Sequence, residues 1–323
     1  MKTEIVSASA ADAVSRAVDL LREGEALALP TETVYGLAAD ALREDAVLKI
    51  FEAKSRPRFD PLIVHLPDAD WIDRVAIVDE STRPLFERLR NQFWPGPLTF
   101  IFPRQPVMPD VVTAGLETVA VRLSSHPVFR NIIAGFGRPL AAPSANRFGR
   151  ISPTAAAHVL DELDGVIPLI VDGGPTLHGL ESTIVALRNG RIEVLRRGPI
   201  TEEQLRVFGE VAVTGATGNP EAPGQLPSHY APRTPLVIVE DAASFQPPTG
   251  RRCGLLSWKT GADARFAEVR ALSRAQELAE AATNLFRFLR ELDGCQLDLI
   301  VAETLPDEGL GAAINDRLRR AAT

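Results

Sequence analysis

Residues 30–65 contain side chains of the types that bind anions. The hydroxyls of Thr31 and Thr33 follow a short apolar segment, and the cations of Lys54 and Arg56 come about one helix later. Arginine can hold a phosphate through two parallel hydrogen bonds, and lysine adds a point charge. The two cations alone are equally compatible with a solvated helix end. Together with the hydroxyls they indicate a site for an anionic ligand, most simply a nucleotide.

The usual sequence signatures of nucleotide and hydrolytic sites are missing. The chain contains no G-x-x-x-x-G-K-[ST] motif, no G-x-G-x-x-G motif and no serine-hydrolase elbow. Its two cysteines, Cys253 and Cys295, have no histidine at a spacing that indicates a catalytic pair. We therefore expect phosphate binding without a P-loop and no covalent intermediate between the protein and its ligand.

His65 lies inside the apolar run Leu62–Leu66, which has the length of a strand buried on both faces. A histidine in such a run is more often a core residue than a ligand. The remaining histidines are scattered and lack the spacing of metal ligands: His126, His158, His178 and His229. We therefore expect no metal site made by histidine.

Two loops carry small polar groups where a sheet could bind a ligand. In PSANRFGRISPT, the side chains of Ser144, Asn146 and Ser152 lie between a strand and a helix. Strand ends that precede helices are where α/β sheets bind ligands, so we favour a ligand contact over local turns. In DGGPTLHGLEST, Ser182 follows a double glycine, for which a tight turn is the simpler interpretation.

The segment TVAVRLS, residues 118–124, alternates between apolar and polar residues as a strand does. Thr118 and Arg122 then share the face opposite to the core. Such a face is commonly exposed to solvent, and the hydroxyl beside the guanidinium favours a pocket wall only modestly.

The dipeptide Asn189-Gly190 is the strongest short signal for a β-hairpin. The two strands that it predicts are Ser182–Leu187 and Arg191–Arg196. A two-residue turn pairs Thr183 with Arg196 across the hairpin. Ser182 and Arg196 are therefore expected at the same end.

The periodicity of apolar residues predicts alternating helices and strands, which is typical of an α/β fold. Helices are predicted over residues 10–23, 44–54, 153–163, 273–291 and 309–320, and after the capping box of Thr201 and Gln204. Strands are predicted over residues 25–29, 62–66, 118–124, 166–171, 236–239, 254–257 and 297–302, and in the hairpin.

The composition changes after residue 209, where glycine and proline become frequent. We predict a first domain over residues 1–209, a linker over 210–235 and a small α/β domain over 236–323. Tyr230 lies among the prolines of the linker. It either pins the linker to a domain surface, which is the simpler interpretation, or indicates that the linker covers a site.

The overall composition is that of an ordinary soluble globular protein, with 45% hydrophobic and 24% charged residues. No apolar run reaches the length of a bilayer span, and the N-terminus has no export-signal pattern. We therefore expect a cytoplasmic protein with reduced thiols and no membrane partner. The net charge of −7 argues against a general nucleic-acid coat, although a local basic groove is compatible with it.

Seven segments occur in the order PTETVYGL, KSRP…PLIVH, WPGPLTF, TVAVRLSSHP, APSANRFGRISPT, DGG…GLEST and VLRRGP. In this order they resemble the YrdC-like domain of threonylcarbamoyl-AMP synthases. The segment SHYAP and the part after it resemble the long, two-domain form of that family. The resemblance implies an α/β fold: a YrdC-like twisted mixed open sheet with helices, plus a small Rossmann-like α/β C-terminal domain. A Pro/Gly-rich linker that covers the active site would join them.

The resemblance also implies an activity, that of a nucleotidyltransferase. Members of the family join L-threonine, bicarbonate or carbon dioxide, and ATP into L-threonylcarbamoyladenylate and pyrophosphate. A separate transferase then uses the adenylate to form threonylcarbamoyladenosine next to the anticodon of tRNAs. Further implied partners are therefore tRNA and that transferase, and the implied cofactor is Mg²⁺ with ATP.

Site residues follow from the resemblance position by position. Catalytic roles near the phosphates fall to Lys54 and Arg56. Contacts to threonine fall to Thr33, His65, Arg122, Ala142 and Ser182. Contacts to ATP fall to Arg56, Asp60, Thr118, Ser144, Ser152, Arg196 and Tyr230.

Asp60 departs from the pattern, because the family usually has asparagine there. A carboxylate beside a triphosphate should repel it unless the carboxylate is protonated, bound to Mg²⁺ or paired with Arg58. The contact of Asp60 with ATP is the least secure of these assignments.

Two alternatives remain open. A hydrogenase-maturation carbamoyltransferase carries a similar domain, but it adds zinc-finger cysteines that the two cysteines here cannot supply. A module that binds double-stranded RNA or tRNA without catalysis would not require the hydroxyls and Arg122. It predicts a steep dependence of RNA affinity on salt.

Overall fold

The first part of the chain forms one large mixed sheet. In the computed structural model, which describes residues 2–214 and 230–322, the described residues place eleven strands in the order β1-β8-β2-β3-β7-β4-β6-β5-β9-β10-β11. The strands are β1 (Glu4–Ser7), β2 (Leu27–Leu29), β3 (Gly36–Asp40), β4 (Ile63–His65), β5 (Leu98–Pro103), β6 (Thr118–Arg122), β7 (Leu140–Ala141), β8 (Leu169–Asp172), β9 (Thr183–Arg188), β10 (Arg191–Arg196) and β11 (Val211–Val213). Parallel and antiparallel pairs alternate irregularly, which confirms the predicted mixed sheet.

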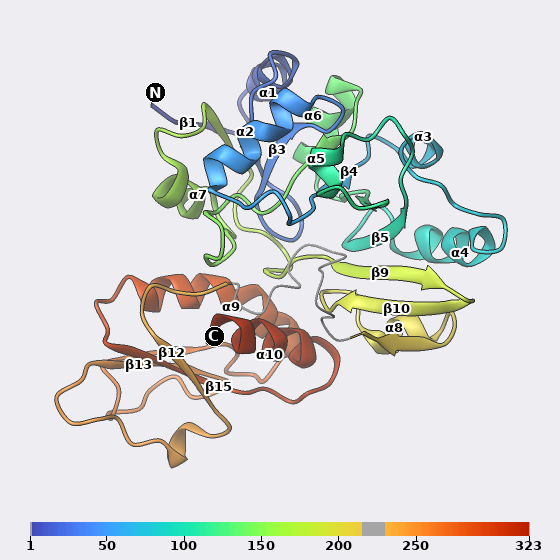
Figure 1. Ribbon diagram of the computed structural model, residues 1–323. Coiled ribbons are helices and arrows are strands. Elements are labelled where there is room, and N and C mark those ends of the chain that lie inside the picture. The colour runs from blue at the N-terminus through green and yellow to red at the C-terminus, as the bar shows by residue number, and fades with distance from the viewer. Residues whose placement is uncertain (1, 215–229, 323) are drawn as a thin grey trace.

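Helices cover this sheet because the strands are apolar on both faces. Leu27 and Leu29 of β2 pack with helices α1 and α6, whereas Ala28 between them belongs to the cluster on the other face. Figure 1 shows α1 and α6 together at the top of the molecule. The helices are α1 (Ala13–Arg22), α2 (Glu44–Lys54), α3 (Ile72–Val75), α4 (Arg83–Phe93), α5 (Asp110–Thr113), α6 (Pro127–Phe136), α7 (Ala156–Leu163) and α8 (Glu202–Arg206), with a 3₁₀ turn η1 (Ala69–Trp71).

Several predicted boundaries are confirmed, and one is wrong for a clear reason. Helix α2 spans the predicted residues 44–54, and the capping box of Thr201 and Gln204 begins α8. Helix α7 begins at Ala156, three residues after Pro153, and not at residue 153. Residues 151–154 are buried without helical structure, and Tyr35 donates its backbone N–H to the carbonyl of Pro153. This tertiary hydrogen bond keeps the segment extended.

The predicted hairpin is present, with one correction to its register. Asn189 and Gly190 have φ angles of +52° and +74°, as a tight two-residue turn requires. The pairing shifts between Val194 and Arg196, so Arg196 lies opposite Ile184 and not Thr183. A bulge adds a residue to β10. Arg196 still reaches the end of the hairpin where Ser182 lies.

The C-terminal part forms a second, parallel sheet. In the described residues its order is β12-β15-β13-β14, formed by β12 (Leu236–Val239), β13 (Cys253–Ser257), β14 (Glu268–Ala271) and β15 (Leu299–Glu303). Helices α9 (Leu278–Asp293) and α10 (Gly309–Ala321) pack against one another, and η2 (Ala242–Ser244) follows β12. The predicted helix 273–291 begins late, because Gln276 has a φ of +59° and Ser273 accepts a hydrogen bond from the backbone of Glu277.

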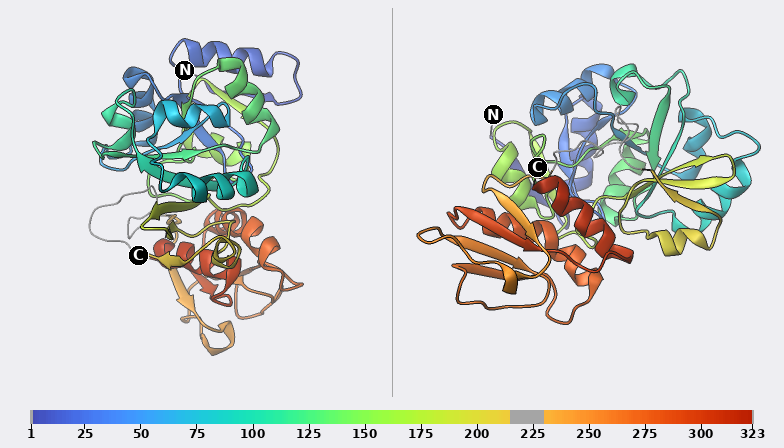
Figure 2. Two further views of the ribbon diagram at one scale, coloured as in Figure 1. Left: turned by 90° about the vertical axis from the view of Figure 1, so that its right-hand side faces the viewer. Right: turned by 60° about the horizontal axis from the view of Figure 1, so that its bottom comes forward.

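The two parts share a hydrophobic core. One cluster joins Leu180 and Ile151 of the first part to Tyr230 and to Leu285 and Phe286 of α9. In Figures 1 and 2, α9 and α10 lie between the C-terminal sheet and the first part. The predicted linker differs at its start, since Val211–Val213 is the edge strand β11 of the large sheet. Residues 215–229 of the predicted linker lie outside the described residues.

Candidate functional site

A single pocket gathers most of the predicted site residues. It encloses about 540 Å³, part of it open to solvent. The predicted residues that line it are Thr33, Arg56, His65, Arg122, Ala142, Ser144, Ser182, Arg196 and Tyr230. Others in its wall are Thr31, Val34, Gly36, Ile63, Pro143 and Glu181. The pocket therefore draws on the loop after β2, on strands β4 and β6, and on the hairpin.

Strands β4 and β6 place His65 and Arg122 side by side, because the two residues are partners in a parallel register. Arg122 Nη1 donates to Thr33 Oγ1 over 3.0 Å. Arg122 Nη2 lies 2.6 Å from Glu32 Oε1. Glu32 thus holds Nη2 of Arg122, whereas Nε has no hydrogen-bond partner in the described part of the chain. Arg122 can therefore donate a hydrogen bond from Nε to a carboxylate ligand.

Glu32 keeps its negative charge although it is buried. Burial by itself would raise the pKa of its carboxyl group. The charge of Arg122 and the hydrogen bond from Ser124 Oγ outweigh this effect and lower the pKa to about 2. Arg122 is thus fixed by a carboxylate of its own while it faces the pocket.

His65 is neutral in the folded protein. Burial and the nearby charge of Arg122 lower the pKa of the imidazole to about 3. Its ring lies 4.7 Å from the ring of Phe129, and its Nδ1 has no hydrogen-bond partner among the described residues. The side chain thus packs in the core and also lines the pocket, where its Nδ1 can form a hydrogen bond with a ligand.

The predicted phosphate-binding cations lie in different surroundings. Arg56 Nη2 is 2.8 Å from Asp60 Oδ2 and donates to the carbonyl of Pro61 over 2.8 Å. Lys54 Nζ donates to the carbonyls of Ser144 and Asn146 over 2.6 and 2.5 Å. Burial and the charge of Arg56 lower the pKa of Lys54 to about 7. Arg56 lines the pocket, whereas Lys54 supports the loop that supplies Ser144.

Asp60 is fully buried and pairs with Arg56, not with the exposed Arg58. Burial raises the pKa of its carboxyl group, and the charges of Arg56, Lys54 and Arg196 oppose that rise. The described structure therefore gives Asp60 a partner that was not among those expected. Its contact with ATP stays a prediction.

The hairpin brings Ser182 and Arg196 together as predicted. Arg196 Nε donates to the carbonyl of Ser182 over 3.1 Å, and its Nη2 donates to Ser182 Oγ over 3.1 Å. Tyr230 has an exposed fraction of 1% and lines the same pocket. Its ring stacks on Phe286 with a centroid distance of 5.4 Å. The tyrosine thus both lines the site and is anchored to the C-terminal part.

Four predicted site residues lie outside the pocket lining: Lys54, Asp60, Thr118 and Ser152. Thr118 shares the face of Arg122 but begins the strand that Arg122 ends, roughly 13 Å away at the rise of a strand. Ser152 Oγ donates to Glu181 Oε1 over 2.5 Å and so lies behind the wall. The catalytic role of Lys54 and the ATP contacts of Asp60, Thr118 and Ser152 remain predictions, as do the ligand contacts of the residues that line the pocket.

Sequence reasoning missed three charged residues at the site. Glu32 stands between the two threonines of PTET, and Glu181 precedes Ser182 in GLEST. Arg317 on α10 donates to Glu181 Oε2 over 3.1 Å. Carboxylates are not expected in a site that binds anions, so neither glutamate was predicted. They could have been found by asking which acidic residues pair with the buried arginines, because a buried charge needs a partner.

Two known protein-family models together match nearly the whole chain. A family model described as "Telomere recombination" matches residues 19–198. A second one, described as "Threonylcarbamoyl-AMP synthase, C-terminal domain", matches residues 200–323. The chain belongs to the threonylcarbamoyl-AMP synthase family. The resemblance read from the motif order is therefore confirmed, as is the two-domain form.

Relatives of this family align over nearly the full chain. The threonylcarbamoyl-AMP synthase of Bacillus subtilis (strain 168) is 43% identical over 327 residues, which cover 96% of this chain and 92% of the relative. That of Pyrococcus abyssi is 40% identical, with 94% and 92% covered. The crystal structure of P. abyssi Sua5 complexed with L-threonine superposes with a TM-score of 0.90 at 37% identity, and covers 99% of this chain and 98% of that one.

The threonylcarbamoyl-AMP synthases are enzymes, and the family match excludes a non-catalytic RNA module as the class of this protein.

Within the described residues, no group of three or more acidic, histidine or cysteine side chains could hold a metal ion. No helix in residues 2–214 and 230–322 is both long and apolar enough to cross a membrane.

Proposed function

We propose that this protein is an L-threonylcarbamoyladenylate synthase that uses L-threonine, carbon dioxide or bicarbonate, and ATP. One observation carries the proposal: residues assigned to threonine and residues assigned to ATP line the same buried pocket. A pocket that holds both substrates can bring them into contact without bulk water. The likeness to a P. abyssi protein complexed with L-threonine supports the choice of amino acid.

The reaction then needs no nucleophile from the protein. The amine of threonine attacks the carbon of carbon dioxide, a C–N bond forms, and one proton leaves to solvent. An oxygen of the resulting carbamate attacks the α-phosphorus of ATP, and the bond to pyrophosphate breaks. The protein has to position two anions and stabilise the charge that develops between them.

We propose that one group of pocket residues binds threonine and another binds the phosphates of ATP. We propose that Arg122 binds the threonine carboxylate, to which its Nε can donate, with Thr33, His65 and Ser182 in the same pocket. We propose that Arg56 and Arg196 receive the phosphates, and that Lys54 adds charge from beneath the loop of Ser144. Ser144 and Tyr230 would then flank the nucleotide.

We also propose that Mg²⁺ accompanies ATP. Magnesium commonly binds through phosphate oxygens and water with few protein ligands, so a site without a carboxylate cluster among the described residues fits it. The ion would supply charge neutralisation on the triphosphate. Arg56 would act on the same phosphates as a fixed cation, and Lys54 would add its charge when it is protonated.

The product is a mixed anhydride that another enzyme must consume. We propose that a separate transferase passes its threonylcarbamoyl group to tRNA next to the anticodon, to give threonylcarbamoyladenosine. Because ATP and tRNA are its reactants, we place this chemistry in the cytoplasm. Direct contact of tRNA with this protein would appear as binding that weakens steeply with salt.

The decisive test is the release of pyrophosphate by the purified full chain. ATP, Mg²⁺ and bicarbonate are supplied with and without L-threonine, and the nucleotide product is identified by mass spectrometry. The proposal expects threonine-dependent pyrophosphate together with threonylcarbamoyl-AMP. Pyrophosphate release that does not depend on threonine would overturn it. D-threonine serves as the matched control, because it carries the same groups in the wrong geometry.

A further inference from the structure

Arg317 is an arginine from the C-terminal part that is buried against the pocket. Its exposed fraction is 0%, and it heads the largest fully buried side chains of the described residues. Taking a charge out of water costs several kcal/mol per ion unless partners compensate for it. The partners of Arg317 therefore indicate what this charge does.

All three nitrogens of the guanidinium are engaged. Nε donates to Glu181 Oε2 over 3.1 Å, Nη2 to the carbonyl of Arg197 over 2.8 Å, and Nη1 to Asp316 Oδ2 over 2.9 Å. Cζ lies 5.3 Å from the centre of the Tyr230 ring, which is the geometry of a cation–π contact. Burial opposes ionisation, but the surrounding negative groups raise the pKa of Arg317 above its ordinary value, so it stays a cation.

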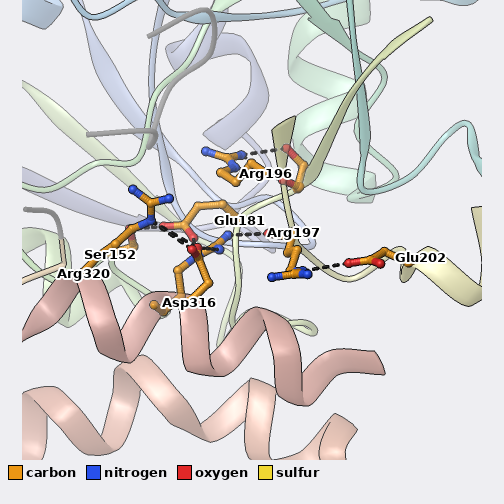
Figure 3. A network of polar contacts seen from close by, with 9 residues as sticks. Ser152, Glu181, Arg196, Arg197, Glu202, Asp316 and Arg320 are labelled. Atoms are coloured by element: carbon orange, nitrogen blue, oxygen red, sulfur yellow. Dashed lines mark hydrogen bonds and ion pairs between the residues drawn. The ribbon is translucent and has the colours of Figure 1, made fainter. Parts of the chain in front are cut away.

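Two of these partners belong to the pocket. Glu181 and Tyr230 both line it, and Glu181 directly precedes Ser182, to which Arg196 donates. The other carboxylate oxygen of Glu181 accepts from Ser152 Oγ. Figure 3 shows Glu181 between Ser152 and Asp316, with Arg196 above it and helices of the C-terminal part below.

A carboxylate in the wall of an anion pocket would repel a polyphosphate. The ion pair with Arg317 removes most of that repulsion and fixes the carboxylate against the C-terminal helix. The same guanidinium contacts the ring of Tyr230, which forms part of the pocket wall. One side chain of α10 thus sets both the charge and the shape of the nucleotide end.

We propose that Arg317 is a positioning residue for ATP: it neutralises Glu181 and holds Glu181 and Tyr230 in place, so that the C-terminal part completes the active site. The choice of ATP as the anion rests on the proposed function above. The contacts themselves do not depend on that choice.

The test compares Arg317→Met with the charge-balanced double variant Glu181→Gln/Arg317→Met. Arg319→Met is the control, because Arg319 lies on the same helix with 57% of its side chain exposed. The readouts are kcat and the KM values for ATP and threonine in the pyrophosphate assay. Arg317→Met should raise the KM for ATP about thirtyfold and leave the KM for threonine within about twofold, because it leaves a buried carboxylate unpaired. The double variant should recover most of the loss.

A role in folding alone gives a different pattern. The proposal is overturned if Arg317→Met changes both KM values equally, or if the double variant is no better than the single one. Should Arg317→Met be insoluble, Arg317→Lys replaces it, because lysine keeps the charge but loses the fork of donors. A KM for ATP equal to that of the unmodified protein would then contradict the proposal.

Failure of the proposed function is recognised separately. If the unmodified protein and Arg319→Met release no threonine-dependent pyrophosphate, the activity is wrong. Calorimetric titration with α,β-methylene-ATP then measures the nucleotide site directly. Weaker binding in Arg317→Met than in the double variant still supports the inference, and equal binding in both rejects it.

Discussion

Arg122 is 3% exposed, and its Nε has no hydrogen-bond partner in the described part of the chain. Glu32 and Thr33 hold its other two nitrogens. A buried donor without an acceptor costs free energy in the free protein. A carboxylate ligand would recover that cost, so we expect Arg122 to be a main determinant for an amino-acid substrate.

Replacing Arg122 by lysine tests this role. Lysine keeps the charge but cannot form two parallel hydrogen bonds, so we expect a loss of about 2 kcal/mol, or roughly thirtyfold in the KM for threonine. The KM for ATP should stay unchanged. Arg74→Lys is the control, since Arg74 lies over the ring of Trp71 at 4.6 Å and outside the pocket lining. Equal losses for both substrates would contradict the assignment.

The imidazole of His65 should make the protein sensitive to acid. Its pKa is about 3 when folded, against the ordinary 6.5 of the unfolded chain, because burial disfavours the charged form. Between these values the unfolded chain binds a proton that the folded protein does not. Stability must therefore fall as the pH drops below 6.5.

The variant His65→Asn should lose part of this dependence. Between pH 6.5 and 4.5 its free energy of unfolding should fall by about 2 kcal/mol less than that of the unmodified protein, as measured by urea denaturation. Above pH 7.5 the imidazole is neutral in both states, so the two proteins should then change in parallel. Identical slopes at acid pH would mean that His65 is protonated in the folded state.

How far the site could be predicted depends on the kind of residue. Thr33, Arg122 and Ser182 were assigned through the family resemblance of the motif order, and all three line the pocket. Their contacts with threonine stay a prediction. Glu181 and Arg317 are far apart in the chain and meet only when α10 packs against the pocket wall. No local pattern encodes such a pairing, because a buried ion pair depends on tertiary placement.

At the scale of elements, the hairpin of β9 and β10 shows what a short motif controls. Its turn needs left-handed backbone at Gly190, where φ is +74° and no atom lies within 4 Å of the place a Cβ would take. The bulge before Arg196 was not predictable, because it depends on pairing and not on turn residues. The sequence thus determined the turn, and tertiary contacts determined the register at the pocket.

Gly190→Ala should destabilise the protein through backbone conformation alone. The expected cost is about 1 kcal/mol in the free energy of unfolding, because an L-residue is disfavoured at this φ. Gly209→Ala is a matched control: its surroundings are equally open and its φ lies outside the left-handed region. That variant should be neutral or slightly stabilised. Equal effects of the two substitutions in urea denaturation would show that the turn conformation is not the cause.

Predictions of elements succeeded in part. Helix α2 and strand β12 have the predicted bounds, whereas helices α4 and α6 and strands β7 and β14 were among the elements not predicted. Strand β7 has two residues, too few for an alternation to be visible. Strand β14 carries Glu268 and Arg270, whose charges hide the apolar pattern. Such edge or short strands form because a neighbouring strand offers hydrogen bonds.

At the scale of the whole molecule, the two sheets are joined by one apolar cluster that includes the pocket tyrosine. Phe286 of α9 is fully buried and stacks on Tyr230, and the same cluster contains Leu180 from the segment before Glu181. A loss of packing in the C-terminal part should therefore weaken ligand binding in the pocket. Domains joined only by a flexible tether would not show this coupling.

Phe286→Ala measures that coupling. Deleting a buried phenylalanine side chain should cost about 3–5 kcal/mol in the free energy of unfolding. The KM for ATP should also rise, because the ring of Tyr230 loses its support. Phe266→Ala is the matched control: Phe266 is 7% exposed and packs with Phe245 on the far face of the C-terminal sheet. It should lower stability by a similar amount and leave the KM for ATP unchanged, since no pocket residue touches that cluster. If both variants or neither change the KM, packing at the junction does not shape the nucleotide end, and the contact with Arg317 holds Tyr230 instead.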